Sequence, residues 1–163
     1  MKRHSFAAGL ALAVVCILVF ASPAAAKAQV PFKGRLAGVA TVTPLKPPIV
    51  SVDLEGWGNA TQLGDFAVSI PHLADRSNGT TVGTYEFTAA NGDTLTADFT
   101  GRATPTDVPG VRAIVDTAII TGGTGRFAGA TGEFTVERLV DTATGETEGS
   151  FEGTISSPGA GKR

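Results

Sequence analysis

The chain has 163 residues, of which 42% are hydrophobic and 17% are charged, and its formal net charge at pH 7 is −2. One cysteine and two histidines exclude a disulfide framework and a zinc site, because both need several such side chains. The absence of a basic cluster argues against nucleic acid as a partner.

The start of the chain is typical of a secretory signal peptide. Basic residues at 2–4 precede an apolar run over 6–20, and small residues follow up to Ala26; this order of segments marks export signals. We predict cleavage after Ala26, with Ala28 as the alternative, and a secreted or periplasmic product. The run is short for a membrane span, so no stable membrane anchor is expected once the signal is removed.

Beyond the signal, we expect a linker over 27–32, one β domain over 33–156 and a disordered tail over 157–163. Strand-like segments recur from residue 34 at intervals of about a dozen residues, separated by Gly, Pro, Asn and Asp. No window of helical length has the apolar period of a helix.

The first predicted strands cover residues 34–43, 49–60 and 66–70. In the second, Val50, Val52 and Leu54 alternate with polar residues, as they do in a strand with one buried face. We expect the third strand to end at Pro71 and His72 to lie in a solvated loop. Two further alternating runs flank Asn91-Gly92, a pair that predicts a hairpin with a type I′ turn.

Residues 111–120 are apolar on both faces of the predicted strand. Val115 and Ile119 fall on one face, whereas Ile114 and Ile120 fall on the other. One face would fill the interior of a barrel, and the other would meet a tail, a loop or a partner subunit.

The remaining segments complete an all-β pattern. Alternating runs over 133–140 and 150–155 bring the total to about eight strands, the number at which an up-and-down antiparallel sheet closes into a small barrel. We therefore predict a single antiparallel, mostly up-and-down, eight-stranded β-barrel, with a β-sandwich of the same strands as the alternative.

Residues 121–132 form a glycine-rich connection between two of these strands. The segment holds five glycines around one large apolar side chain, Phe127, and a strand pattern resumes at Glu133. This leaves no helix to hold a pyrophosphate, so we interpret the segment as a shaped turn that places Phe127 in one end of the barrel. The predicted structural residues here and in the hairpin are Gly122, Gly123, Gly125, Phe127, Gly129, Gly132, Asn91 and Gly92.

Three blocks of sequence, residues 58–64, 89–93 and 122–132, resemble a group of secreted bacterial domains of unassigned function. That group usually has His where this chain has Gln62. More distantly, the Gly-Gly-Thr-Gly-x-Phe motif of the third block resembles the plant allene oxide cyclases and dirigent proteins. The resemblance implies a calycin-like barrel without cofactor or metal, and it suggests homo-oligomers. The cyclases close a fatty-acid epoxide in an apolar cavity, and the dirigent proteins steer the coupling of phenol radicals.

The sequence offers no convergent set of catalytic or metal-ligating residues. The candidate ligand-binding residues are Tyr85 and Phe87, on the apolar face of one strand, and Arg138, which shares the inward parity of Phe134 and Val136. The favoured hypothesis is a secreted barrel that binds a small apolar molecule or a surface partner. The alternatives are a cofactor-free isomerase or cyclase and a structural, oligomeric interaction module.

Overall fold

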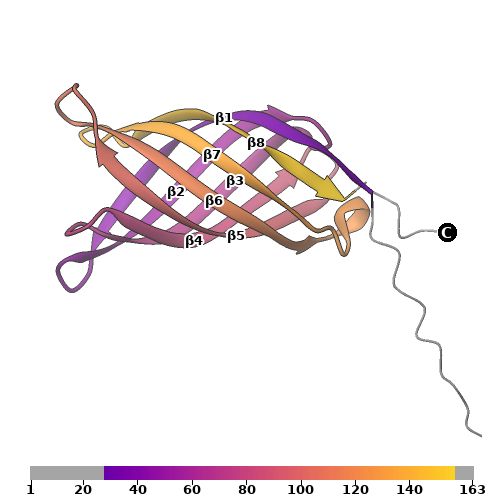
Figure 1. The fold of residues 1–163 in the computed structure, drawn as a ribbon, viewed down its shortest axis with the longest axis horizontal. Helices are drawn as coiled ribbons and strands as arrows, with labels where there is room; N and C mark the ends of the chain where they lie inside the picture. The colour runs from indigo at the N-terminus through magenta and orange to yellow at the C-terminus, as the bar shows by residue number, and fades with distance from the viewer. Residues whose placement is uncertain (1–27, 157–163) are drawn as a thin grey trace, which may run out of the picture.

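In the computed structural model, which describes residues 28–156, the chain forms one closed antiparallel barrel in which each strand pairs with its neighbours in sequence (Figure 1). β1 pairs with both β2 and β8, so the sheet has no free edge and the prediction of a closed up-and-down barrel is confirmed over the sandwich. The strands are β1 (Gln29–Pro44), β2 (Ile49–Ala60), β3 (Gly64–Asp75), β4 (Thr80–Ala89), β5 (Thr94–Pro105), β6 (Val111–Gly123), β7 (Gly132–Asp141) and β8 (Glu146–Ser156).

Alternate side chains along each strand point into the barrel, as the period of a strand requires. In β6, Ile114 and Ile120 are buried, whereas Val115 and Ile119 are 48% and 62% exposed on the outer wall. This strand therefore has an apolar side chain on each face, as predicted. No other described residue covers the outer one.

Aromatic rings fill the middle of the barrel. The closest ring centroids are those of Tyr85 and Phe99, at 4.8 Å, and those of Phe32 and Phe151, at 5.0 Å. Inward-facing glycines make room for them: a Cβ on Gly34 would collide with the Phe151 ring. The barrel is thus packed with pairs of large and very small residues on neighbouring strands.

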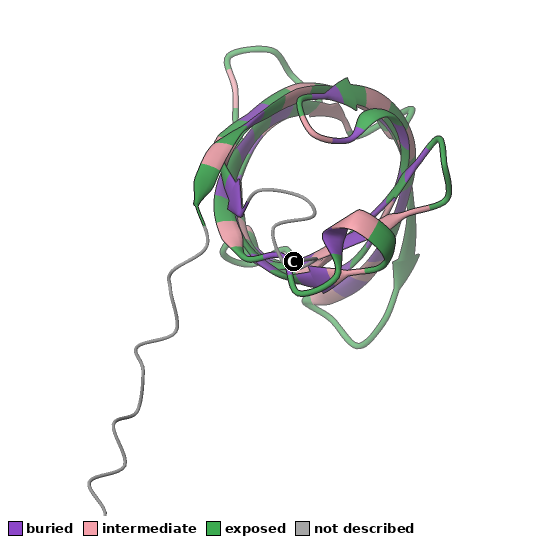
Figure 2. Ribbon diagram, turned by 90° about the vertical axis from the view of Figure 1, so that its right-hand side faces the viewer, coloured by how far each residue is buried: buried purple, intermediate pink, exposed green. Residues whose placement is uncertain are grey.

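The 3₁₀ helix η1 (Gly125–Phe127) lies at the end of the barrel where β1 begins and β8 ends (Figure 1), and it projects over the inside of the ring of strands (Figure 2). Phe127 is fully buried in the core. Arg126 fixes the helix to neighbouring turns, because its Nη2 donates to the Leu63 carbonyl at 2.9 Å and its backbone N–H donates to Asp93 at 3.2 Å. The segment can turn back on itself because Gly125 and Gly129 have φ values of +54° and +65°.

The opposite end of the barrel carries the β1–β2, β3–β4, β5–β6 and β7–β8 loops (Figure 1). These loops are hydrogen-bonded to neighbouring strands or loops. The carbonyls of Gly79 and Gly145 accept from the backbone N–H of Ala103 and Ala40, at 2.8 and 2.9 Å, and Gly110 accepts from Thr142 at 2.8 Å. The rim of this end is therefore tied together by backbone hydrogen bonds.

Two segments are more ordered than the sequence suggests. β1 begins at Gln29, within the expected linker: Val30 and Phe32 pair with β8, and Phe32 is fully buried. β3 does not end at Pro71 but continues to Asp75. The β3–β4 ladder has no pairs at Ile70 and Pro71 and resumes at His72, so the missing N–H of proline falls in a gap of the ladder.

The hairpin at Asn91-Gly92 is present, but its turn differs from the expected type I′. Only Gly92 has positive φ, at +84°, whereas Asn91 does not. The Gly92 N–H donates to the Ala89 carbonyl, and the Ala89 N–H donates to the Asp93 carbonyl. This pattern is typical of a three-residue loop in which one left-handed glycine follows an ordinary turn.

The predicted signal peptide and tail lie outside the described residues, as does residue 27 of the predicted linker.

Candidate functional site

A cavity of about 580 Å³ opens at the end of the barrel opposite η1; we call it the mouth pocket. The barrel strands supply its walls, and the β3–β4 and β7–β8 loops contribute to its rim. The walls are mostly aliphatic, whereas polar side chains lie deeper. The aliphatic lining residues include Val42, Val50, Val52, Ile114 and Val140, and the polar ones include His72, Thr81 and Arg138.

Below the mouth pocket lies a cluster of buried polar side chains around Asp116, which is fully buried. The Tyr85 hydroxyl donates to Asp116 Oδ2 at 2.7 Å, and the Thr81 hydroxyl donates to Oδ1 at 3.3 Å. Arg138 Nη2 lies 3.5 Å from Oδ2 and forms the ion pair of the cluster. We refer to these four residues as the polar floor.

Arg138 is incompletely satisfied. Its side chain is 2% exposed, and its contact with Thr147, from Nη1 to Oγ1, is long at 3.5 Å. Its Nε and Nη2 have no hydrogen-bond acceptor among the described residues. Leaving buried guanidinium donors unpaired costs free energy, because water that would solvate them has been removed.

His72 lies beside the polar floor, on the inner face of β3, and is buried rather than in a solvated loop as expected. Its Nδ1 lies 2.9 Å from the Ile70 carbonyl oxygen, which can only accept, so Nδ1 carries the proton and Nε2 is the acceptor of the neutral ring. Burial lowers the pKa of His72, and the Arg138 charge lowers it further. Burial and the charge of Asp116 raise the pKa of Tyr85 well above its usual value. Near pH 7, His72 is therefore neutral and Tyr85 is protonated.

Glycines on neighbouring strands create the space for this cluster. A Cβ on Gly101 would collide with the Asp116 carboxylate and the Thr81 hydroxyl, and a Cβ on Gly83 would collide with His72. Gly149 faces Arg138 in the same way. Asp116, Thr81 and Arg138 of the floor, like His72 beside it, thus occupy volume opposite an inward-facing glycine.

The sequence-predicted ligand-binding residues lie at different depths. Arg138 lines the mouth pocket, whereas Tyr85 lies in the polar floor and Phe87 lies deeper, stacked on Tyr85 with ring centroids 5.7 Å apart. Phe87 is fully buried among aromatic rings. The sequence reasoning missed Asp116 and the inward position of His72. A charged residue at the inward parity of an apolar run was the available signal for Asp116.

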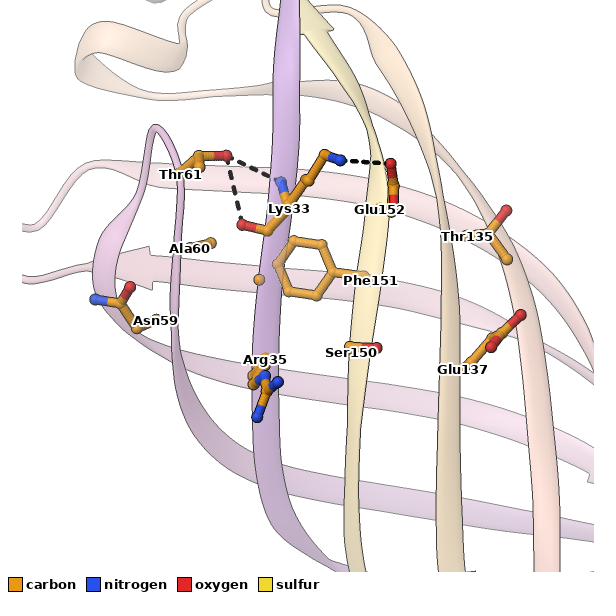
Figure 3. Close-up of a pocket in the computed structure, with 11 residues that line it drawn as sticks. Lys33, Arg35, Asn59, Ala60, Thr61, Thr135, Glu137, Ser150, Phe151 and Glu152 are labelled. Carbon is orange, nitrogen blue, oxygen red and sulfur yellow. Dashed lines mark hydrogen bonds and ion pairs between the residues drawn. The ribbon is translucent and has the colours of Figure 1, made fainter.

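The outer wall of the barrel also has hollows, and the one in Figure 3 is lined by no buried polar side chain. One hollow of about 630 Å³ lies over β1, β2, β7 and β8 (Figure 3). Lys33 pairs there with Glu152 at 2.6 Å, and the Thr61 hydroxyl accepts from the Lys33 backbone N–H at 2.9 Å. The side chains of this ion pair are 53% and 72% exposed, so water solvates both. The mouth pocket is therefore the stronger candidate site.

In the part of the chain that the structure describes, no group of three or more His, Cys, Asp or Glu side chains is arranged to hold a metal ion. No helix within residues 28–156 has the length and apolar character needed to cross a membrane.

The fold and the site together define a small closed barrel whose middle is filled by aromatic rings and whose open end is a pocket with a polar floor. No family model and no curated protein matches the sequence. Among solved structures, a pterocarpan synthase dirigent protein is similar, with a TM-score of 0.53 and 13% identity over 85% of this chain and 98% of that one. The chain therefore has a dirigent-like barrel fold.

Proposed function

We propose that this protein binds a small, largely apolar organic molecule in the mouth pocket. The observation that carries the proposal is the pocket itself: about 580 Å³ with aliphatic walls and a few polar groups at its inner end. Small-molecule sites commonly have this size and combine an apolar lining with a few polar groups that orient the ligand.

The filled core defines how far such a molecule can enter. Tyr85, Phe87 and Phe134 are almost fully buried and in mutual ring contact, so they close the barrel beneath the pocket. A ligand therefore contacts the mouth half of the strands and the polar floor, and it does not pass through the barrel.

Titration with the uncharged fluorophore N-phenyl-1-naphthylamine tests this proposal. We expect saturable, one-to-one binding with enhanced fluorescence, because an apolar pocket excludes water from the dye. Ala103→Trp should abolish the binding, since Ala103 lines the pocket. The matched control is Thr104→Trp, one residue along the same strand, where the side chain is exposed and does not line the pocket. An absence of saturable binding to the unmodified protein, or equal binding by both variants, would refute the proposal.

A second candidate function is a cofactor-free isomerase or cyclase. It is supported by the short Tyr85–Asp116 hydrogen bond and by the neutral His72 beside it, because these groups can donate and accept protons inside a pocket. The similar solved structure is named as a synthase, and the sequence resembles the allene oxide cyclases in one motif.

Incubation with an allene oxide generated in situ tests the second candidate. An enzyme of this kind should give an enantiomerically biased cyclopentenone, and Asp116→Asn should remove the bias. A racemic product, equal to that of spontaneous cyclisation, would exclude this activity.

A further inference from the structure

The mouth pocket contains more hydrogen-bond donors than free acceptors. Three arginines, Arg76, Arg112 and Arg138, line it, together with the carboxylates of Asp75 and Asp141. The formal charges of these three arginines are balanced by those of Asp75, Asp141 and Asp116 below the pocket. The excess of donors therefore arises because the rim carboxylates are already hydrogen-bonded and the arginines are not.

The two rim carboxylates are engaged within their own loops. Asp75 Oδ1 accepts from the backbone N–H and the hydroxyl of Ser77, at 2.8 and 2.6 Å. Asp141 Oδ1 accepts from the backbone N–H of Ala143 at 2.7 Å. Hydrogen bonds from Ser77 lower the pKa of Asp75, so this carboxylate is ionised near neutral pH. It stabilises the β3–β4 turn by accepting those hydrogen bonds.

The arginines are not engaged in this way. Among residues 28–156, neither Arg76 nor Arg112 forms an ion pair, and the Arg112 side chain has no hydrogen-bond partner. Within the described residues, Arg138 Nε and Nη2 have no hydrogen-bond acceptor: Nη2 makes only the 3.5 Å ion pair with Asp116, which already accepts from Tyr85 and Thr81. A group that supplies acceptors to the pocket would therefore satisfy donors that this chain leaves unpaired.

We propose that the ligand is an organic anion of the carboxylate class, with its anionic group at Arg138 and its apolar body against the aliphatic walls of the mouth pocket. This inference rests on the proposed small-molecule binding. Arg112, on the inner parity of β6 at the rim, attracts the anion on its way to Arg138. Guanidinium suits this role because it donates several hydrogen bonds in the plane of a carboxylate and stays charged when buried.

A matched pair of probes, 2-naphthoate and the neutral 2-naphthamide, tests the charge requirement at pH 7.5 and low salt. We expect naphthoate to bind about tenfold more tightly, because hydrogen bonds to a charged partner are the stronger kind. Arg112→Gln should weaken naphthoate several-fold and leave naphthamide unchanged. The matched control, Arg102→Gln, lies at the same end of the barrel but faces outward and does not line the pocket, so it should leave both affinities unchanged.

A double variant tests the position of the anion. Asp116→Asn with Arg138→Gln removes both charges of the floor together, so no unpaired buried charge remains to unfold the chain. The preference for naphthoate should then fall to the part that Arg112 supplies, and N-phenyl-1-naphthylamine should still bind. An undiminished preference for naphthoate would overturn the assignment to Arg138.

The outcomes distinguish a failure of the anion inference from a failure of the proposed small-molecule binding. Equal affinities of naphthoate and naphthamide in the unmodified protein, with the neutral dye still bound, would refute the anion and leave the small-molecule pocket standing. An absence of binding by all three compounds would refute both.

Discussion

Truncation of Phe127 to alanine should remove much of the stability of the barrel. Phe127 is fully buried, and removing a buried phenylalanine side chain costs about 3–5 kcal/mol through lost transfer energy and the cavity left behind. A domain of this kind has a total stability of about 5–15 kcal/mol, so the loss is a large fraction of it. With a urea m-value of about 2 kcal/mol/M, the unfolding midpoint should fall by roughly 2 M.

Arg126→Ala is the matched comparison on the same 3₁₀ helix. Its side chain is 37% exposed, and it contributes one hydrogen bond, to the Leu63 carbonyl, and a long 3.9 Å contact with Asp93. Losing these should cost about 1 kcal/mol. Urea unfolding is best followed by far-UV circular dichroism, because Trp57, the only tryptophan, is 63% exposed and reports poorly on the core. Equal, small shifts for both variants would refute the role of Phe127 as a plug of the core.

Three further predictions concern the polar floor and its neighbours His72 and Gly101. Asp116→Asn should destabilise the fold by about 3 kcal/mol or more, since the Arg138 charge is then buried without a partner. Adding Arg138→Gln should restore part of the lost stability. If urea melts show that the double variant loses the sum of the two single losses, the pairing is contradicted. The pKa of His72 is lowered on folding, so the unfolded chain takes up its proton first and stability should fall as the pH drops below 6.5. His72→Gln should flatten that fall in pH-dependent unfolding, and an unchanged profile would show that His72 is not its source. Gly101→Ala should cost about 1–3 kcal/mol in thermal or urea melts, because the added methyl group displaces the Asp116 carboxylate, whereas the outward-facing Thr100→Ala should change stability by less than about 0.5 kcal/mol.

The barrel could be predicted from the sequence because its signals are local. Alternation along each strand and short connections between strands require neighbours in sequence to pair, and the structure pairs them. Residues 29–32 of the predicted linker form a strand because their partner is β8, at the far end of the sequence, and no local pattern reveals that closure. The extension of β3 past Pro71 is not visible locally because proline usually ends a strand, whereas the β3–β4 ladder omits the pairs at Ile70 and Pro71 and then resumes.

The site was less predictable because it joins residues from distant strands. Tyr85 and Asp116 are 31 positions apart, and Arg138 comes from a third strand. Parity correctly placed Arg138 on the inner face, but parity alone does not say which inward-facing residues lie at the same depth. That depth follows from strand register and tilt, which alternation leaves open.

The hydrogen bonds between the rim loops bear on how fast the proposed ligand can enter and leave the mouth pocket. The carbonyls of Gly79, Gly110 and Gly145 each accept a backbone hydrogen bond from a neighbouring strand or loop, so these loops are held in the open position seen in the structure. Entry then requires no preceding rearrangement, and association should be a single step whose observed rate rises linearly with ligand concentration. Among related ligands the association rate constant should vary little, and differences in affinity should appear in the residence time.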